Sequence, residues 1–366
     1  MNKKEFNNSI IGNVNNFINF DYNSKINYNF KKSPANLKYQ LELFKSRSSE
    51  FEVFLSYKDN KEYIALSEEE SGHLYIYSLF DKQLIQNFKL DKKIKQLKYY
   101  INNKDNNEYL IGICQEENNN ENDHSYLIIW DITNNYEIKF IEKLDYNINN
   151  YCLAFPPNHN FNYIILCSLY KSPNIEGKIK AYSLNNFQFI KDIFNVGKSS
   201  EELLSFYSKL ENKYYIVYMD RLLLINLLED NNYYQLSEKS HQNGLIINKN
   251  NIDYLCCYYG NGIQLWDLYN KKIIKTIKIN YLNCFIQWNN NYLIGFSADD
   301  HAFKIIDLEK GIYETNYINS NNKDNNNNPS RFMKKILHPK YGESLLTDSL
   351  GNGFNENIIN INLWSA

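Results

Sequence analysis

Of the chain's 366 residues, 43% are hydrophobic and 16% aromatic, and its 32 Tyr and 21 Phe favour strands, because aromatic side chains suit pleated, half-buried surfaces. The formal net charge is -2, from 40 basic and 42 acidic residues, and the only arginines are Arg47, Arg221 and Arg331. A near-neutral chain with so few arginines lacks the basic surface of a duplex nucleic-acid binder and the planar groups suited to phosphate, so we expect no nucleic-acid partner.

A short phrase recurs seven times along the chain, each time at the end of a predicted strand. The copies are LYIYSL (74–79), LIIWDI (127–132), IKAYSL (179–184), LLLINL (222–227), IQLWDL (263–268), FKIIDL (303–308) and INLWSA (361–366). The fourth position holds the large residues Tyr77, Trp130, Tyr182, Ile225, Trp266, Ile306 and Trp364. They lie 40 to 58 residues apart, and a period of roughly 40–45 residues is that of a four-stranded propeller blade.

Alternation of apolar and polar residues predicts the other strands of each repeat. In the first repeat these are Phe51–Tyr57, Glu62–Ser67 and Gln83–Leu90, and in the sixth they are Cys284–Trp288, Tyr292–Ser297 and Ile312–Ile318. Helical periodicity is rare, and Lys92–Ile101 is the most ambiguous window. Four strands per repeat, named a to d and joined by short turns, predict antiparallel blades.

The chain resembles the WD-repeat β-propellers, whose repeats often close strand c with a Trp-Asp dipeptide. Trp130-Asp131 and Trp266-Asp267 match this dipeptide, and Leu293–Leu308 follows the family's pattern of strand b, turn and strand c. The resemblance covers roughly residues 37–366 and implies an all-β fold, a seven-bladed WD-repeat β-propeller with four antiparallel strands per blade.

One family feature is missing, the Gly-His dipeptide that usually opens a repeat before strand a. Gly72-His73 falls in a b–c turn instead. We therefore expect the family's buried network of His, Ser, Asp and Trp to be incomplete in every blade, and apolar packing to hold the blades together.

The two ends of the sequence predict how the ring closes. Because the sequence ends two residues after Trp364, no strand d follows the last phrase, and Leu37–Phe44 is placed to supply that outer strand. Closure of this kind leaves only short, protected sheet edges. The predicted domains are an Asn-rich N-terminal extension, residues 1–36, and the propeller, residues 37–366; whether the extension packs on the propeller is left open.

The cysteines and the apolar segments predict a cellular location. No two cysteines show C-x-x-C spacing and most lie in apolar strand-like runs, so we expect buried, reduced thiols in a cytosolic protein. They are Cys114, Cys152, Cys167, Cys256, Cys257 and Cys284. The N-terminus shows no secretory signal, and the apolar runs are far shorter than the roughly 20 residues of a membrane helix. We expect a cytoplasmic protein without membrane insertion, and a nuclear location is left open.

No catalytic, cofactor-binding or metal site is predicted, because the six His lie in different repeats and no phosphate-binding or nucleophile motif occurs. The nearest approach to a chemical cluster, Ser297–His301, is interpreted as a polar b–c turn, and Gly260–Gly262 as a tight hairpin. The acidic runs Glu68–Glu70 and Glu116-Glu117 are interpreted as solvated loops, with binding of Ca²⁺ or of a basic partner as the alternative. Trp288 is interpreted as buried between blades, with a partner anchor as the alternative.

The long insertions all fall in b–c or d–a turns, which lie on one face of a propeller. They are Gln115–Ser125, Tyr170–Gly177, Asn319–Arg331 and Ser349–Asn357. Insertions confined to one face often mark the binding face. Neutral growth of loops is an equal alternative, because Asn is about one residue in six here and loops tolerate it; binding would then use the ordered surface that the insertions leave uncovered.

The resemblance implies a non-catalytic protein–protein interaction scaffold, a monomeric propeller within a complex that presents the loops of one face to other proteins or peptides. Two alternatives are kept: a structural subunit of a larger assembly, and a catalytic propeller such as a glycosidase, which needs paired acids. The W-D-x-R motif of ubiquitin-ligase receptors is absent, because Thr133 and Tyr269 stand at its last position, and so is the paired Arg of phosphoinositide-binding propellers. The binding residues are unknown from the sequence.

Overall fold

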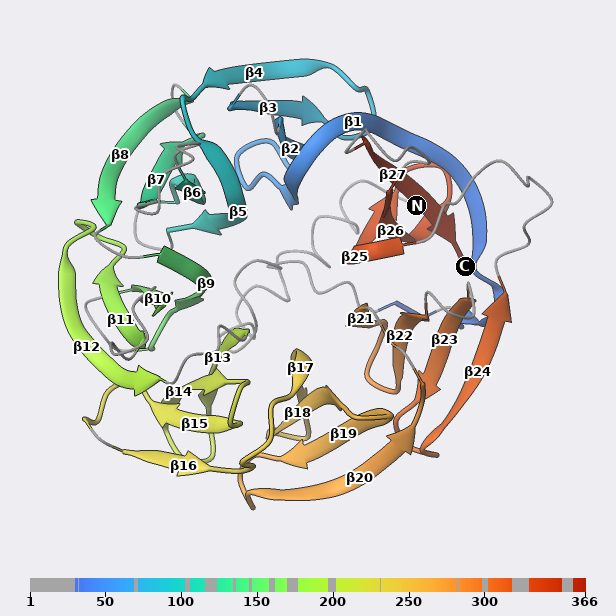
Figure 1. The fold of residues 1–366 in the computed structure, drawn as a ribbon. Coiled ribbons are helices and arrows are strands. Elements are labelled where there is room, and N and C mark those ends of the chain that lie inside the picture. Colours follow the sequence, from blue (N-terminus) through green and yellow to red (C-terminus); the bar gives the residue numbers. More distant parts are fainter. Residues whose placement is uncertain are drawn as a thin grey trace.

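The computed structural model describes residues 30–31, 33–68, 72–102, 106–115, 124–133, 136–144, 147–157, 162–169, 177–196, 202–230, 232–280, 282, 284–297, 302–317, 329–350 and 358–366. They form a ring of seven blades, each with four antiparallel strands, which confirms the predicted fold class (Figure 1). Within these ranges the one helical element is a short 3₁₀ helix, η2 (Pro34–Asn36), and no helix there has the length and apolar character to span a bilayer.

Strands a to d follow one another from the inside of each blade to the outside. Blade 1 contains the second half of β1 (Lys38–Leu55), β2 (Glu62–Glu68), β3 (His73–Ser78) and β4 (Leu84–Lys89); blade 2 contains β5 (Lys93–Ile101), β6 (Glu108–Gln115), β7 (Ser125–Asp131) and β8 (Glu137–Leu144). Blade 3 contains β9 (Asn147–Ala154), β10 (Tyr163–Leu169), β11 (Gly177–Ser183) and β12 (Phe189–Val196); blade 4 contains β13 (Leu203–Ser208), β14 (Lys213–Tyr218), β15 (Leu223–Asn226) and β16 (Tyr233–Gln235).

The remaining three blades repeat the same order. Blade 5 contains β17 (Gln242–Lys249), β18 (Ile252–Tyr259), β19 (Gly262–Asp267) and β20 (Lys272–Lys278); blade 6 contains β21 (Cys284–Gln287), β22 (Tyr292–Ser297), β23 (Ala302–Asp307) and β24 (Ile312–Tyr317). Blade 7 contains β25 (Pro329–His338), β26 (Gly342–Leu350), β27 (Ile358–Ser365) and the first half of β1. All seven copies of the recurring phrase lie in strand c, and the ambiguous window Lys92–Ile101 forms strand β5.

Strand β1 closes the ring because it belongs to two blades. Lys38–Arg47 pairs antiparallel with β27, and Ser48–Leu55 pairs with β2, so blades 7 and 1 share one seven-stranded sheet. Figure 1 shows the blue strand β1 running from the red last blade into the first. The predicted closing strand, Leu37–Phe44, is confirmed and continues beyond Phe44. The boundary between residues 36 and 37 stays a prediction, although Phe30 of the extension does pack on the propeller.

The large residue of the recurring phrase fills the junction with the preceding blade. Seven apolar clusters lie at the seven junctions, and each includes the large residue of the following blade, from Tyr77 between blades 7 and 1 to Trp364 between blades 6 and 7. Burial of apolar surface is worth roughly 25 cal/mol per Å². The expectation that apolar packing joins the blades is confirmed.

The polar residue that follows the large one caps the turn between strands c and d. In five blades a side-chain oxygen of this residue accepts a hydrogen bond from a backbone amide of that turn, with 2.8 to 3.1 Å between nitrogen and oxygen. These residues are Asp131, Ser183, Asn226, Asp267 and Asp307. Asp, Asn and Ser can exchange at this position because each offers an oxygen that accepts a hydrogen bond from the backbone two or three residues ahead.

Each outer strand also contacts the c–d turn of the next blade. Lys275 of β20, for example, donates to the carbonyl oxygens of Leu308 and Glu309 in blade 6, at 3.0 and 2.6 Å. At the end of the ring Asn316 of β24 donates to the carbonyl oxygens of Ala35 and Leu37, at 3.3 and 3.2 Å. In blade 7 strands c and d come from distant parts of the sequence, so the segment at η2 takes the place that a c–d turn has in other blades.

Candidate interaction surface

The described residues contain no group of three or more His, Cys, Asp or Glu that could hold a metal ion. All six cysteines are free and buried, as expected, and burial raises the pKa of the Cys167 thiol to about 12. A thiol held in its neutral form is a poor nucleophile and a poor metal ligand. Ser297 is buried, and the rest of the Ser297–His301 cluster lies outside the described residues.

Two interpretations made from the sequence can be compared with the structure. Gly260 and Asn261 form the two-residue hairpin between β18 and β19, and Gly260 has φ +58°, so the predicted tight turn is confirmed. Trp288 is fully buried at the junction of blades 6 and 7, which confirms burial over a role as an exposed anchor. Of the two acidic runs only Glu68 is described, and it accepts a hydrogen bond from the hydroxyl of Tyr75 at 3.3 Å.

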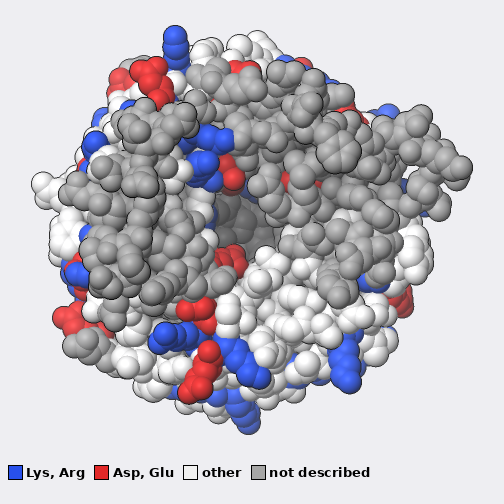
Figure 2. All heavy atoms as spheres, viewed as in Figure 1, with Lys and Arg blue, Asp and Glu red and all other residues white. Residues whose placement is uncertain are grey.

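The four long insertions lie almost entirely outside the described residues, so their role stays a prediction. The described strand ends that flank them lie on the b–c and d–a face; Gln115 and Ser125, for example, pair in neighbouring strands. Figure 2 shows one face of the ring with a hollow at its centre, around which the described basic and acidic residues are interspersed. The opposite face, formed by the a–b and c–d turns, is described except for residues 103–105, 134–135, 158–161 and 231, so a surface can be built from its residues.

Three half-exposed residues lie on the a–b and c–d face at blades 4 and 5, and we call them the tyrosine cluster. Their exposed fractions are 50% for Leu210, 37% for Tyr234 and 49% for Tyr269. Leu210 lies in the a–b turn of blade 4, Tyr234 in the outer strand β16 and Tyr269 in the c–d turn of blade 5. Tyrosines anchor interfaces well, because each adds a large rigid contact area at low conformational cost.

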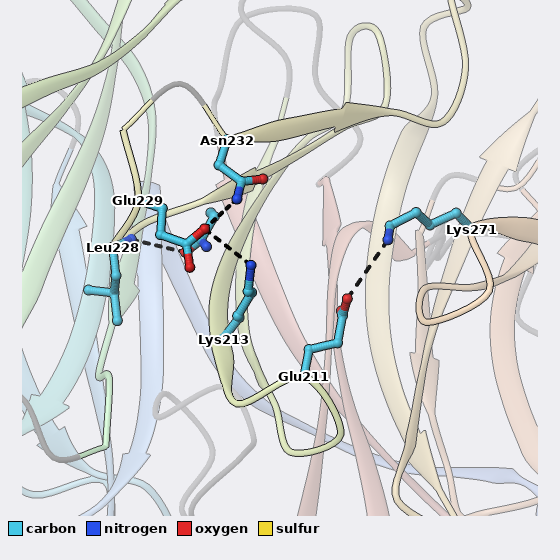
Figure 3. Close-up of polar contacts among 7 residues, drawn as sticks. Glu211, Lys213, Leu228, Glu229, Asn232 and Lys271 are labelled. Carbon is cyan, nitrogen blue, oxygen red and sulfur yellow. Dashed lines mark hydrogen bonds and ion pairs between the residues drawn. The ribbon is translucent and has the colours of Figure 1, made fainter.

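Lys271 links the two blades beneath this cluster. Its ammonium lies 3.8 Å from Glu211 Oε1, as Figure 3 shows. The same ammonium lies 3.7 Å from the centre of the Tyr234 ring. A cation over the face of an aromatic ring is attracted to it, and more strongly where water is excluded. Lys271 therefore fixes the position of a blade 4 ring relative to the c–d turn of blade 5.

A second set of polar contacts stiffens the c–d turn of blade 4. Figure 3 shows Lys213 and Asn232 converging on Glu229, with the Lys213 ammonium 3.1 Å from Glu229 Oε2. The hydrogen bond from Lys213 holds the pKa of the Glu229 carboxyl below its usual range. Exposed ion pairs add little to the free energy of unfolding. The contacts of Glu229 therefore fix the conformation of this turn more than they stabilise the fold.

A second exposed feature runs around the rim of the same face. The residue of strand d directly opposite the large residue of the phrase is apolar in all seven blades: Tyr39, Leu84, Ile138, Phe189, Tyr233, Ile273 and Tyr313. Each of these side chains is between 39% and 52% exposed. The rim covers the outer edge of the buried large residues, and it gives the ring a regular apolar border.

Sequence reasoning missed both the tyrosine cluster and one histidine. His241 is buried just before strand a of blade 5, where the WD-repeat resemblance places the His of the Gly-His pair, but Ser240 precedes it in place of Gly. Its Nε2 lies 3.2 Å from Gln264 Oε1, which also accepts from Trp266 Nε1. A search for a buried His ahead of strand a, without the Gly, would have found it.

Two solved structures are similar to this chain in fold. The β-propeller domain of Cps50 (Swd1) from Myceliophteria thermophila aligns with a TM-score of 0.57 at 10% identity, over 90% of this chain and 99% of that one. The Dos1 propeller aligns with a TM-score of 0.54 at 14% identity, over 84% and 76% of the two chains. No family model and no curated protein matches the sequence. At these identities the likeness shows the fold alone, a β-propeller.

Proposed function

We propose that this chain is a non-catalytic protein-interaction scaffold of the WD-repeat type, which binds a partner protein through the tyrosine cluster at blades 4 and 5. The observation that carries the proposal is the group of half-exposed side chains Leu210, Tyr234 and Tyr269, which lie in or beside short turns that ion pairs hold in place. Binding energy concentrates in a few aromatic anchors, and a surface that is already ordered loses little entropy on binding. The mixed charges around the ring favour a protein partner over a polyanion.

The test removes two anchors that lie in turns, where the fold depends on them least. Leu210→Ser with Tyr269→Ser is compared with a matched pair on outer strands of other blades, Ile141→Ser with Tyr317→Ser, whose side chains are 52% and 67% exposed. Tagged chains are purified from the native cell and co-purifying proteins are quantified. We expect specific partners to fall by roughly 10-fold or more with the first pair only, because hot-spot truncations cost 2 kcal/mol or more. Equal partner yields from both pairs would disprove this surface, and robust hydrolase turnover would disprove the scaffold.

The apolar rim favours a second candidate function, a structural subunit of a larger assembly. The observation that favours it is that a half-exposed apolar or aromatic side chain recurs at the same position of every outer strand. Hydroxyl-radical footprinting of the native complex and of the purified chain separates the two candidates. A structural subunit should show protection at rim residues of most blades, from Leu84 to Tyr313, whereas a scaffold that uses the tyrosine cluster should show it at blades 4 and 5 only.

We further propose a cytoplasmic location, without excluding the nucleus. The six buried free cysteines support it, because reduced thiols persist in the cytosol and nucleus. Imaging of a tagged chain in the native cell tests it, and accumulation in a secretory compartment would contradict it.

A further inference from the structure

The N-terminal segment places one aromatic ring in the junction between blades 6 and 7. Phe30 is buried there, with its ring edge-on to Trp288, 4.5 Å between ring centres and 68° between ring planes. Trp288 begins the a–b turn of blade 6 and shares the apolar cluster of this junction with Leu345 and Trp364. Edge-to-face pairs stabilise an aromatic ring beyond the area that it buries, so the junction suits an aromatic side chain better than an aliphatic one.

Two side chains hold the main chain beside that ring. Asn289 Nδ2 donates to the carbonyl oxygen of Phe30 at 3.3 Å, and the amide of Lys31 donates to Glu343 Oε1 at 2.9 Å. Asn289 belongs to blade 6 and Glu343 to blade 7, so the peptide spans the junction. These bonds engage a carbonyl and the next amide, groups that nearly any peptide offers. Specificity therefore rests on the one buried ring, since Lys31 is exposed.

Lys335 completes the site from the inner strand of blade 7. Its ammonium donates to the carbonyl oxygen of Trp288 at 3.2 Å and lies 5.6 Å from the centre of the Phe30 ring. Burial lowers the pKa of this ammonium to about 8. A partly dehydrated cation gains more from an aromatic face than a fully hydrated one does.

Glu343 occupies a position that recurs elsewhere in the ring. Its carbonyl oxygen accepts a hydrogen bond from the amide that directly follows strand c, that of Ala366. The carbonyl oxygen of Glu108 accepts the equivalent hydrogen bond, from the amide of Ile132, in blade 2. The Glu108 carboxylate accepts the amide of Tyr57, in the a–b turn of the preceding blade, whereas the Glu343 carboxylate accepts the amide of Lys31. At the junction of blades 6 and 7 the N-terminal segment therefore donates the hydrogen bond that the a–b turn of blade 1 donates at the junction of blades 1 and 2.

Phe30 and Lys31 are separable from the closure of the ring. The ladder between β1 and β27 begins at Lys38, and Asn316 holds Ala35 and Leu37 by separate hydrogen bonds. Release of Phe30 from the junction therefore leaves the closing strand paired.

The geometry points to a peptide-binding site at the junction of blades 6 and 7, which Phe30 fills until an aromatic side chain in a peptide segment of a partner protein displaces it. This inference rests on the proposed scaffold function and adds to it a second contact and the chemistry of the partner. Because a short tether gives a ligand an effective concentration in the millimolar range, Phe30 blocks the site against weak binders. A partner must therefore offer its aromatic peptide alongside other contacts.

The test uses the full chain and a fluorescein-labelled peptide of residues 27–33. We expect the Phe30→Ala chain to bind this peptide at least about 10-fold more tightly than the unaltered chain, by fluorescence anisotropy, because the tethered competitor has lost its ring. The same peptide with Phe30→Ala should bind at least about 10-fold more weakly. Adding Glu343→Gln to the Phe30→Ala chain should weaken binding several-fold, because the carboxylate no longer accepts the amide.

Equal binding by the unaltered and Phe30→Ala chains, or equal binding of the two peptides, overturns the inference. Should Phe30→Ala prevent folding, Phe30→Leu keeps the junction filled with an aliphatic side chain that competes less well than the ring, so this variant should also bind the peptide more tightly than the unaltered chain. In the unaltered chain, millimolar peptide should speed hydrogen exchange of the Lys31 amide, and unchanged exchange also overturns the inference. The Leu210 and Tyr269 variants do not touch this junction, so the two proposals fail separately.

Discussion

Blades 2 and 5 both carry the Trp-Asp pair, yet they hold the indole in different ways. In blade 2 Trp130 is fully buried, and its Nε1 has no hydrogen-bond partner among the described residues. In blade 5 Trp266 Nε1 donates to Gln264 Oε1 at 3.1 Å, and His241 Nε2 lies 3.2 Å from the same oxygen. Among the described residues, packing alone holds the indole of Trp130, whereas packing and a chain of hydrogen bonds hold that of Trp266.

The neighbouring strand b explains this difference. Gly112 and Cys257 occupy the same register position, since each pairs with the residue two places before its tryptophan. A Cβ at Gly112 would lie 2.7 Å from the Trp130 ring, so only glycine leaves room for that ring. Blade 5 has a side chain at this position, and its indole instead bonds to a side chain of its own strand.

The buried acid at the head of strand b differs in the same two blades. Glu108 of blade 2 accepts from the hydroxyls of Ser56 and Tyr99, at 3.0 and 2.6 Å, and from the amide of Tyr57. Asp253 of blade 5 accepts from Asn248 Nδ2 at 2.8 Å, and burial raises the pKa of its carboxyl to about 6. The recurring phrase thus specifies where a large side chain goes, while each blade pairs its buried polar groups in its own way.

The largest effect is expected from Trp130→Ala, which empties the junction of blades 1 and 2. Large-to-small changes in a core cost about 3–5 kcal/mol for tryptophan, and the free energy of unfolding from urea titration should fall by that amount. Tyr317→Ala on an exposed outer strand serves as the control and should change it by less than about 0.5 kcal/mol. A loss below about 1 kcal/mol at Trp130 would mean that the junction collapses around the cavity.

Gly112→Ala tests whether glycine is required beside Trp130. The added methyl lies against the indole at 2.7 Å, so we expect overpacking and a loss of about 1–3 kcal/mol. The double variant Gly112→Ala with Trp130→Phe has a smaller ring, and it should recover most of that loss in a double-mutant cycle. Additive losses would show that the methyl clashes with something other than the ring.

Asp253→Asn tests how the buried carboxyl of blade 5 makes the free energy of unfolding depend on pH. Because folding raises the pKa of this carboxyl from 3.8 to about 6, the folded chain holds the proton more tightly, and the free energy of unfolding falls as pH rises through that window. Asp253→Asn should remove this fall and gain about 1–2 kcal/mol at pH 7. Glu108→Gln should instead destabilise at pH 7, because an amide accepts less well from three donors. Parallel urea titrations between pH 4 and 7 measure both, and equal shifts in the two variants would contradict the comparison.

The strand order, the seven blades and the closing strand could be predicted because the alternation of apolar and polar residues and the spacing of the recurring phrase are read directly from the sequence. The tyrosine cluster could not, since Leu210, Tyr234 and Tyr269 come from three separate segments that only the ring brings together. Contact between Phe30 and Trp288 joins distant parts of the sequence, and no local pattern encodes it. His241 was missed because the search required a preceding glycine, although the hydrogen bond needs only the imidazole.

The smallest effect is expected when Trp130 and Trp266 are each replaced by Phe, and this pair compares the two tryptophans most directly. Trp266→Phe loses the hydrogen bond to Gln264 and leaves that half-buried oxygen with His241, whereas Trp130→Phe removes an N–H that bonds to nothing described. Both changes lose similar ring volume, so their difference isolates the bond, and Trp266→Phe should cost about 1 kcal/mol more. Differential scanning calorimetry of both variants measures the difference. Equal costs would mean that Gln264 finds another donor, and a larger cost at Trp130 would mean that its N–H is satisfied by a group outside the described residues.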